Sequence, residues 1–375
     1  MATWSTAQQL TEPGNNRRIS FTSATVREIR TSVGGKSLRV RFSNGFGDAP
    51  LTIDAAAVAR SAGDGAIVAD SSRSLTFRGK ASVTIQPGAQ WISDVVELAL
   101  PPMADLAVTL RTTTAPDGLT GHPGSRTTSY FSYNDDPVDA PDLTPATRVD
   151  HWYFLSGVDV LTDRTAAVAI LGDSITDGRG STTNGNDRWP DRLSQRLRES
   201  AATTHIAVLN QGIGGNRVLR DGLGPNMLAR LDRDVIAQPG VRWLIILEGI
   251  NDLGTAAGAR AQGSPAATAA DIIAAFDQTI TRAHDHGIKV YGGTIMPYGG
   301  CFYFSEEGEA DRQTINEWIR HSGRFDAVID FDLVARDPDN PSMLQAELHT
   351  GDHLHLNANG LRFIADAIDL SLFEE

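Results

Sequence analysis

From about residue 164 onward, short apolar runs alternate with segments of helical periodicity, and this alternation constrains the fold more than any other feature of the sequence. The helical segments carry apolar residues every third or fourth position, as at Trp189, Leu193 and Leu197. Strands that alternate with helices predict a parallel sheet covered by helices on both faces, a three-layer α/β/α sandwich. Five apolar runs are the predicted strands: Ala166–Leu171, Ile206–Leu209, Trp243–Leu247, Lys289–Thr294 and Ala327–Phe331.

Four polar stretches follow predicted strands or precede the last helix. They are Leu171–Gly178, Asn210–Asn216, Glu248–Asp252 and Asp352–His355. The carboxyl ends of parallel strands meet at one edge of the sheet, and this edge is where open α/β sheets bind ligands. We therefore expect the four stretches to meet in one site.

These stretches supply the parts that acyl transfer requires. Ser174 is a weak nucleophile unless a base lies within reach. Asp352 and His355 are three residues apart, which allows the carboxylate to orient the imidazole while its other nitrogen accepts the serine proton. An oxyanion also needs preorganised donors, for which the candidates are the N–H of Ser174, the N–H of Gly215 and the side-chain amide of Asn251.

In order and spacing, the four stretches resemble the conserved blocks of the GDSL/SGNH hydrolase family across roughly residues 165–370. The matching residues are Gly172-Asp173-Ser174, Gly215, Gly249-Ile250-Asn251-Asp252 and Asp352-His353-Leu354-His355. The resemblance implies a flavodoxin-like sheet, Ser174 as nucleophile, His355 as base and Asp352 as the residue that orients it. It implies neither a metal nor an organic cofactor. Gly215 is the loosest match, because Gly212 and Gly214 compete with it.

Other polar residues near these blocks have weaker assignments. Asp173, Glu248, Tyr298 and His353 are candidates for the walls of the cleft. His349, His353, His355 and Asp352 also form a set that would suit zinc. We set the metal aside, because it would leave the serine and asparagine blocks unexplained.

Residues 1–150 have the pattern of a β domain, with residues 151–375 forming the hydrolase domain. Thr25–Val33 and Ser37–Ser43 flank Gly34-Gly35-Lys36, which predicts a hairpin. Short apolar runs with regular turn signals continue beyond it and favour a β-sandwich of the jelly-roll kind. The predicted strands are Leu51–Ile53, Leu75–Phe77, Val83–Ile85, Val95–Leu98 and Leu106–Thr109. This half also resembles the β domain that precedes the catalytic domain in a subset of bacterial family members, some of them similar to acetylxylan esterases.

Composition narrows the range of partners. The chain of 375 residues has a formal charge of −13, which argues against nucleic acid and against an anionic membrane surface. No run of about 20 apolar residues is present, as a membrane span requires. The single cysteine, Cys301, excludes an internal disulfide. The sequence starts as a mature chain would, so we expect a secreted or periplasmic protein without its signal peptide, although a cytoplasmic location remains open.

These observations predict a serine esterase that releases a short acyl group, acetyl above all, from a small-molecule or carbohydrate ester such as acetylated xylan. A lipase or thioesterase of the same family is the first alternative. A non-catalytic carbohydrate-binding protein is the second. The sequence does not indicate the oligomeric state.

Overall fold

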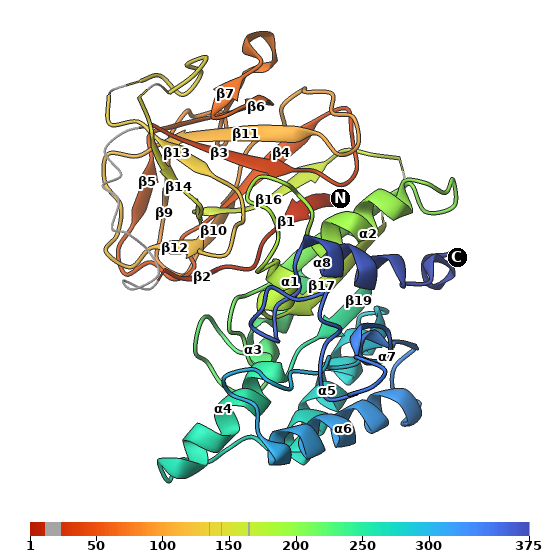
Figure 1. Ribbon diagram of the computed structural model, residues 1–375. Coiled ribbons are helices and arrows are strands. Elements are labelled where there is room, and N and C mark those ends of the chain that lie inside the picture. Colours follow the sequence, from red (N-terminus) through yellow and green to blue (C-terminus); the bar gives the residue numbers. More distant parts are fainter. Residues whose placement is uncertain (12–23, 135, 144, 164–165, 375) are drawn as a thin grey trace. The chain divides into compact units, whose positions relative to one another are not determined.

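A computed structural model describes residues 1–11, 24–134, 136–143, 145–163 and 166–374 (Figure 1). The chain forms two compact units, Met1–Thr165 and Ala166–Glu375. This boundary lies later than the predicted one at residue 150. The difference arises because β15 (Trp152–Tyr153) and β16 (Leu155–Val160) pair with strands of the first unit.

The second unit is built on a five-stranded sheet with the order β18-β17-β19-β20-β21, in which every pair is parallel. All seven residues of β17 are buried, as expected for a central strand with helices on both faces. The five predicted strands are confirmed. Their bounds are β17 Ala166–Gly172, β18 Ile206–Gly212, β19 Val241–Leu247, β20 Lys289–Gly293 and β21 Ala327–Ile329.

Helices pack on this sheet in two groups. Helix α2 (Trp189–Leu197) packs against β18 and α8 (Ala358–Asp366), whereas α5 (Ala269–Asp285) packs against β20 and α6 (Glu306–His321). In Figure 1, β17 and β19 lie between these two pairs. The fold is therefore the mixed α/β arrangement with a parallel sheet that the alternation predicts. The shorter helices are α1 Ser174–Asp177, α3 Met227–Leu231, α4 Ile250–Ala261 and α7 Phe331–Ala335, with a π-helical turn, η2, at Asp232–Ile236.

The sequence accounts for where the longest helix begins and what holds it on the sheet. Thr268 and Asp271 cap the start of α5 reciprocally, each side chain accepting from the other residue's backbone N–H. Ile272, Phe276 and Ile280 lie on its buried face. Burial of each such side chain contributes about 1.5–3 kcal/mol, so the apolar stripe fixes which side of α5 meets the sheet.

The first unit is rich in strands, as predicted. Its largest sheet runs β14-β13-β3-β11-β6-β7 with β8 beside β6, and a second runs β1-β16-β4-β10. The jelly-roll connectivity stays a prediction. The remaining bounds are β1 Ala2–Ser5, β2 Gln9–Leu10, β3 Ala24–Arg30, β4 Leu38–Ser43, β5 Leu51–Ile53, β6 Ala55–Gly63, β7 Ala66–Ile67, β8 Arg73–Leu75, β9 Val83–Ile85, β10 Gln90–Ile92, β11 Asp105–Arg111, β12 Thr120–His122, β13 Ser129–Phe131 and β14 Thr147–Val149.

The predicted hairpin across Gly34 and Gly35 is wrong, because β3 and β4 lie in different sheets. The two glycines instead allow another backbone to approach closely. A Cβ at Gly34 would lie 2.2 Å from the carbonyl oxygen of Leu100, and Gly35 exchanges two backbone hydrogen bonds with Leu100. Similarly, Val95–Leu98 forms no strand, and Val96 makes an isolated bridge to Leu38.

Among the described residues, no helix combines the length and the apolar character that crossing a membrane would take.

Candidate active site

Ser174 stands just beyond the carboxyl end of β17, an interior strand, where the chain leaves the sheet. It is the first residue of α1, and the side chain of Asp173 caps that helix by accepting a hydrogen bond from Ile175 N at 2.9 Å. Gly178 ends the single turn with a φ of +98°, a conformation that favours glycine. The short helix therefore holds Ser174 in a fixed position, with 7% of its surface exposed.

The structure brings Ser174, His355 and Asp352 into one hydrogen-bonded chain. Ser174 Oγ lies 2.8 Å from His355 Nε2, and His355 Nδ1 lies 2.6 Å from Asp352 Oδ2. The other carboxylate oxygen, Oδ1, accepts from the backbone N–H groups of Leu354 and His355 at 3.0 and 2.8 Å. The loop thus orients its own carboxylate, and the carboxylate orients the imidazole.

The protonation state of Asp352 determines the direction of these hydrogen bonds. Partial burial raises the pKa of this carboxyl group, but the hydrogen bonds from the His355 side chain and from the backbone outweigh burial and hold its pKa well below the usual range. An ionised carboxylate can only accept, so Nδ1 carries the imidazole proton. Nε2 is then the acceptor for the Ser174 hydroxyl, as nucleophile activation requires.

The other two candidate oxyanion donors follow the carboxyl ends of β18 and β19, the strands on either side of β17. Gly215 follows β18 and has a φ of +73°, where a Cβ would also meet Leu223 at 2.7 Å. Asn251 lies in the first turn of α4, where the sequence predicts a loop. The helix starts immediately because Gly249, with a φ of +115°, turns the chain within two residues of β19.

The amide of Asn251 is oriented by contacts at both of its ends. Its Nδ2 donates to the carbonyl oxygen of Asn216 at 2.9 Å, and its Oδ1 accepts from the hydroxyl of Tyr303 at 3.5 Å. The amide nitrogen carries two hydrogens, and the bond to Asn216 uses one of them. A second N–H therefore remains to donate to an oxyanion.

The comparisons with known proteins concern this same part of the chain. The family model described as GDSL-like lipase/acylhydrolase matches residues 170–363, which is more than half of the sequence. The chain belongs to this family. Membership implies an esterase or acylhydrolase. None of the curated proteins matches the chain.

Solved structures similar to this GDSL-like acylhydrolase include an acetylxylan esterase from Geobacillus stearothermophilus, studied as a catalytic mutant. It is 19% identical, with a TM-score of 0.42, over 55% of this chain and 94% of that one. A GDSL-like lipase from Bacteroides thetaiotaomicron is 17% identical, with a TM-score of 0.42, over 57% of this chain and 92% of that one.

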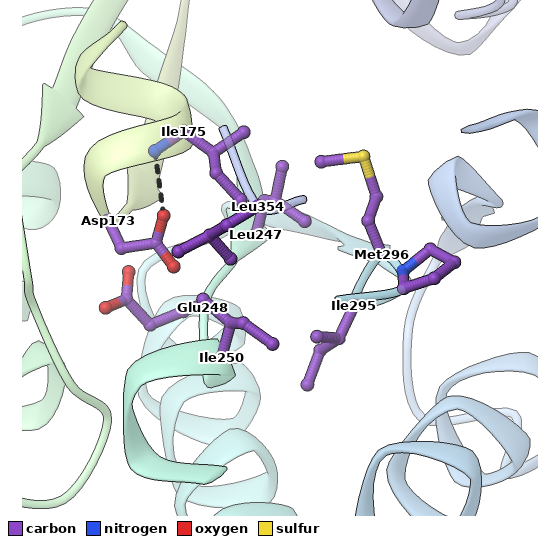
Figure 2. Close-up of a pocket in the computed structure, with 9 residues that line it drawn as sticks. Asp173, Ile175, Leu247, Glu248, Ile250, Ile295, Met296 and Leu354 are labelled. Atoms are coloured by element: carbon purple, nitrogen blue, oxygen red, sulfur yellow. Dashed lines mark hydrogen bonds between the residues drawn. The ribbon is translucent and has the colours of Figure 1, made fainter. Parts of the chain in front are cut away.

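A pocket lies beside Ser174 in this GDSL-like protein. Its lining includes sequence neighbours of Ser174 and His355. It holds about 270 Å³ of empty space, part of which is open to solvent. Figure 2 shows the carboxyl groups of Asp173 and Glu248 facing one another on one side and Met296 across from them. The lining residues are Asp173, Ile175, Leu247, Glu248, Ile250, Ile295, Met296, Pro297 and Leu354.

The other two predicted cleft residues, Tyr298 and His353, are not among the residues that line this pocket. Tyr298 is fully buried and packs against Phe304, with ring centroids 5.2 Å apart, so it belongs to the core and does not line the pocket. His353 lies between Asp352 and His355 in the sequence and has a φ of +58°. Its ring packs on that of His349, with the ring centroids 4.5 Å apart. The described residues contain no group of three or more His, Cys, Asp or Glu side chains placed to hold a metal ion.

Three buried carboxyl groups beneath Ser174 have unusual pKa values. Burial raises the pKa of Asp173 to about 7 and that of Asp252 to about 6. It also raises the pKa of Glu248 well above its ordinary value, and the nearby Asp173 adds to this rise. The guanidinium of Arg230, 3.9 Å from Glu248 Oε2, opposes the rise. Burial outweighs it, because Arg230 already bonds other acceptors, so Glu248 retains its proton to higher pH.

Glu248→Gln should therefore stabilise the protein at high pH. A carboxyl group whose folded pKa is raised contributes stability that is complete below its unfolded pKa of about 4.3 and is lost as the pH rises through the folded value. A glutamine side chain has nearly the same shape but does not ionise in this pH range. We expect the Tm of Glu248→Gln to exceed that of the wild type by about 2–6 °C at pH 8, and by less at pH 5.

Thermal unfolding at the two pH values measures this difference. Glu347→Gln is the matched control, because Glu347 is exposed and the same replacement there removes no buried carboxyl group. A Glu248→Gln protein less stable than the wild type at pH 8 would contradict a protonated, buried Glu248.

Sequence reasoning missed two residues that contact the site, Arg230 and Tyr303. Arg230 lies in α3 between positions of the apolar face, since Met227 and Leu231 are also buried. An arginine flanked by buried positions at helical spacing is the signal that could have identified it, because arginine is almost never fully buried without partners. For Tyr303, the sequence offers no comparable signal.

Proposed function

We propose that this protein is a serine esterase that hydrolyses short-chain acyl esters, acetyl esters above all, of carbohydrates such as acetylated xylan. The observation that carries the proposal is the hydrogen-bonded chain from Ser174 Oγ through His355 to Asp352. A structural serine at a strand end does not need a base whose orientation is fixed by an ionised carboxylate.

In the first half of the reaction, His355 Nε2 accepts the proton of Ser174 as Oγ attacks the ester carbonyl carbon. The carbonyl oxygen becomes an oxyanion, which accepts hydrogen bonds from the backbone N–H groups of Ser174 and Gly215 and from Asn251 Nδ2. Asp352 stabilises the imidazolium that forms. When the tetrahedral intermediate collapses, His355 donates its proton to the departing alcohol oxygen, and the acyl group stays on Ser174.

Water completes the second half by the same steps. His355 removes a proton from water, the resulting hydroxide attacks the acyl carbonyl, and the carboxylic acid leaves as Ser174 regains its proton. Besides the ester and water, these steps use only groups of the protein.

The preference for a short acyl group is supported by the pocket beside Ser174. Two carboxyl groups, Asp173 and Glu248, form part of its wall, and a long hydrocarbon chain would have to lie against them without any hydrogen bond in return. The formal charge of −13 favours a neutral substrate over an anionic one. The carbohydrate alcohol is proposed from the resemblance of the strand-rich first unit to the β domain of acetylxylan esterase-like proteins.

A series of 4-nitrophenyl esters from C2 to C12, run beside acetylated xylan and other acetylated sugars, tests the proposal. We expect kcat/KM to be highest for C2 and to fall with chain length, and acetate to be released from at least one acetylated sugar. A maximum at C8 or longer would instead favour a lipase or thioesterase. Xylan binding without turnover of any ester would favour a carbohydrate-binding protein.

A further inference from the structure

Arg230 is a fully buried charge directly beneath the candidate site. Its side chain has no exposed surface, and the side chain of the facing Glu248 is buried to the same degree. Burying a guanidinium is costly unless its donors are satisfied, so the partners of Arg230 show what its position is used for.

The guanidinium of Arg230 joins the ends of β17 and β18 to the loop that follows β18. Nη2 donates to the carbonyl oxygen of Gly172, the last residue of β17, at 3.0 Å. Nη1 donates to the carbonyl oxygen of Gln211 in β18, and Nε donates to Asn216 Oδ1 at 2.9 Å. A planar fork carries donors in fixed directions on three nitrogens and so reaches three separated acceptors, whereas the donors of an ammonium group all start from a single nitrogen.

Of the two acidic side chains near this charge, Asp234 balances it and accepts a hydrogen bond from Nη1, whereas Glu248 keeps its proton. Asp234 lies 3.3 Å from Nη1, one turn along from Arg230, and Glu248 lies 3.9 Å from Nη2. The guanidinium therefore keeps its orientation toward the strand ends.

Asn216 connects Arg230 to the two oxyanion donors Gly215 and Asn251. Its side chain accepts from Arg230, and its backbone carbonyl accepts from Asn251 Nδ2 at 2.9 Å. Its backbone N–H donates to Ile213 at 3.1 Å, closing the turn that contains Gly215. Arg230 thus contacts the strand that carries Ser174 and, through Asn216, both other donors.

We propose that Arg230 is a positioning residue that fixes the oxyanion donors Gly215 N and Asn251 Nδ2 relative to Ser174. This inference rests on the proposed esterase function. Donors aimed in advance at the oxyanion stabilise the transition state without reorganising, and a displacement of about 1 Å can cost about 10²-fold in rate. Arg230 therefore acts on kcat through Asn216 and touches no substrate.

Asn216→Ala is the decisive variant, because it removes the link to Arg230 and keeps the backbone carbonyl that orients Asn251. It also removes the bonds from Asn216 Nδ2 to the carbonyl oxygens of Pro225 and Leu223, so Arg230→Lys, which leaves both in place, is measured beside it. We expect kcat for 4-nitrophenyl acetate to fall about tenfold or more, with KM within about twofold of the wild type. Arg230→Lys should change kcat in the same direction. Should Arg230→Lys fail to fold, Asn216→Ala decides by itself. Rates are expressed per active site, counted by labelling Ser174 with a phosphonate.

A double-mutant cycle separates positioning from a merely structural role. Asn251→Ala alone should lower kcat by about 10²–10³. Adding Asn216→Ala to it should then cost a clearly smaller factor than in the wild type, because one of the donors that Asn216 positions is gone. Equal factors in the two backgrounds, or an unchanged kcat per labelled site in Asn216→Ala, would overturn the inference.

Arg282→Ala is the matched control. Arg282 also contacts α3, donating to the carbonyl of Leu228 at 3.1 Å, and pairs with Asp232 at 2.7 Å, but it reaches no strand end. It should leave kcat unchanged. A wild-type protein inactive toward every ester tested would refute the proposed function itself. If the wild type is active but Asn216→Ala and Asn251→Ala lower kcat by factors that simply multiply in the double variant, only the role of Arg230 is refuted.

Discussion

Ser174→Ala should abolish ester hydrolysis while the protein remains folded, lowering kcat by about 10⁶-fold. The reason is that alanine removes the atom that forms the acyl-enzyme, and His355 Nε2 loses the hydroxyl that lies 2.8 Å from it. Initial rates with 4-nitrophenyl acetate measure the loss, and mass spectrometry after treatment with a serine-directed phosphonate should locate the label on Ser174.

Ser181→Ala is a suitable control, because Ser181 lies in the loop that follows α1 and its hydroxyl donates to the carbonyl of Gly178. It should retain wild-type activity. A chelator should also leave the wild-type rate unchanged. Activity that survives in Ser174→Ala but disappears in EDTA would point to metal-assisted hydrolysis by the histidines near Asp352.

Asp352→Asn should lower kcat by about 10⁴-fold. An asparagine amide facing His355 Nδ1 can donate to it, and this would place the imidazole proton on Nε2, where it blocks acceptance of the Ser174 proton. The neutral amide would also no longer stabilise the imidazolium. Steady-state kinetics with the acetyl ester measure this loss, and a value within tenfold of the wild type would contradict the assigned role.

The pH profile of the wild type gives a second test of the same chain. Because the pKa of Asp352 lies well below its usual range, this carboxylate stays ionised throughout the working range. Protonation of Asp352 therefore does not produce the acid limb of kcat/KM. That limb should report His355, falling through the pH range in which an imidazole titrates. A rate that stays flat down to about pH 4 would exclude His355 as the base.

The strands of the second unit could be predicted because most of their residues are buried and each strand reads as an apolar run. In the first unit the same reasoning predicted several strands correctly, among them β5 and β9, but it failed at the hairpin. Glycine suits both a tight turn and a close approach of another backbone. At Gly34 and Gly35 the backbone of Leu100, far along the chain, makes that close approach, and the local sequence does not show this. Tyr298 is a candidate for the cleft wall in the sequence, yet its ring is buried in the core.

The sequence by itself determined which chemical groups reach the edge of the sheet. Parallel strands place their carboxyl ends together, so Ser174, Gly215 and Asn251 could be assigned to one edge, and Asp352 and His355 joined them through their spacing. Only the tertiary structure decided which groups face one another. Arg230 bonds three acceptors from two strands and a loop. The fold also buries the carboxyl groups of Asp173, Glu248 and Asp252, and this burial raises the pKa of each. Local sequence does not encode these effects, because distance and solvent exclusion depend on residues far apart in the chain.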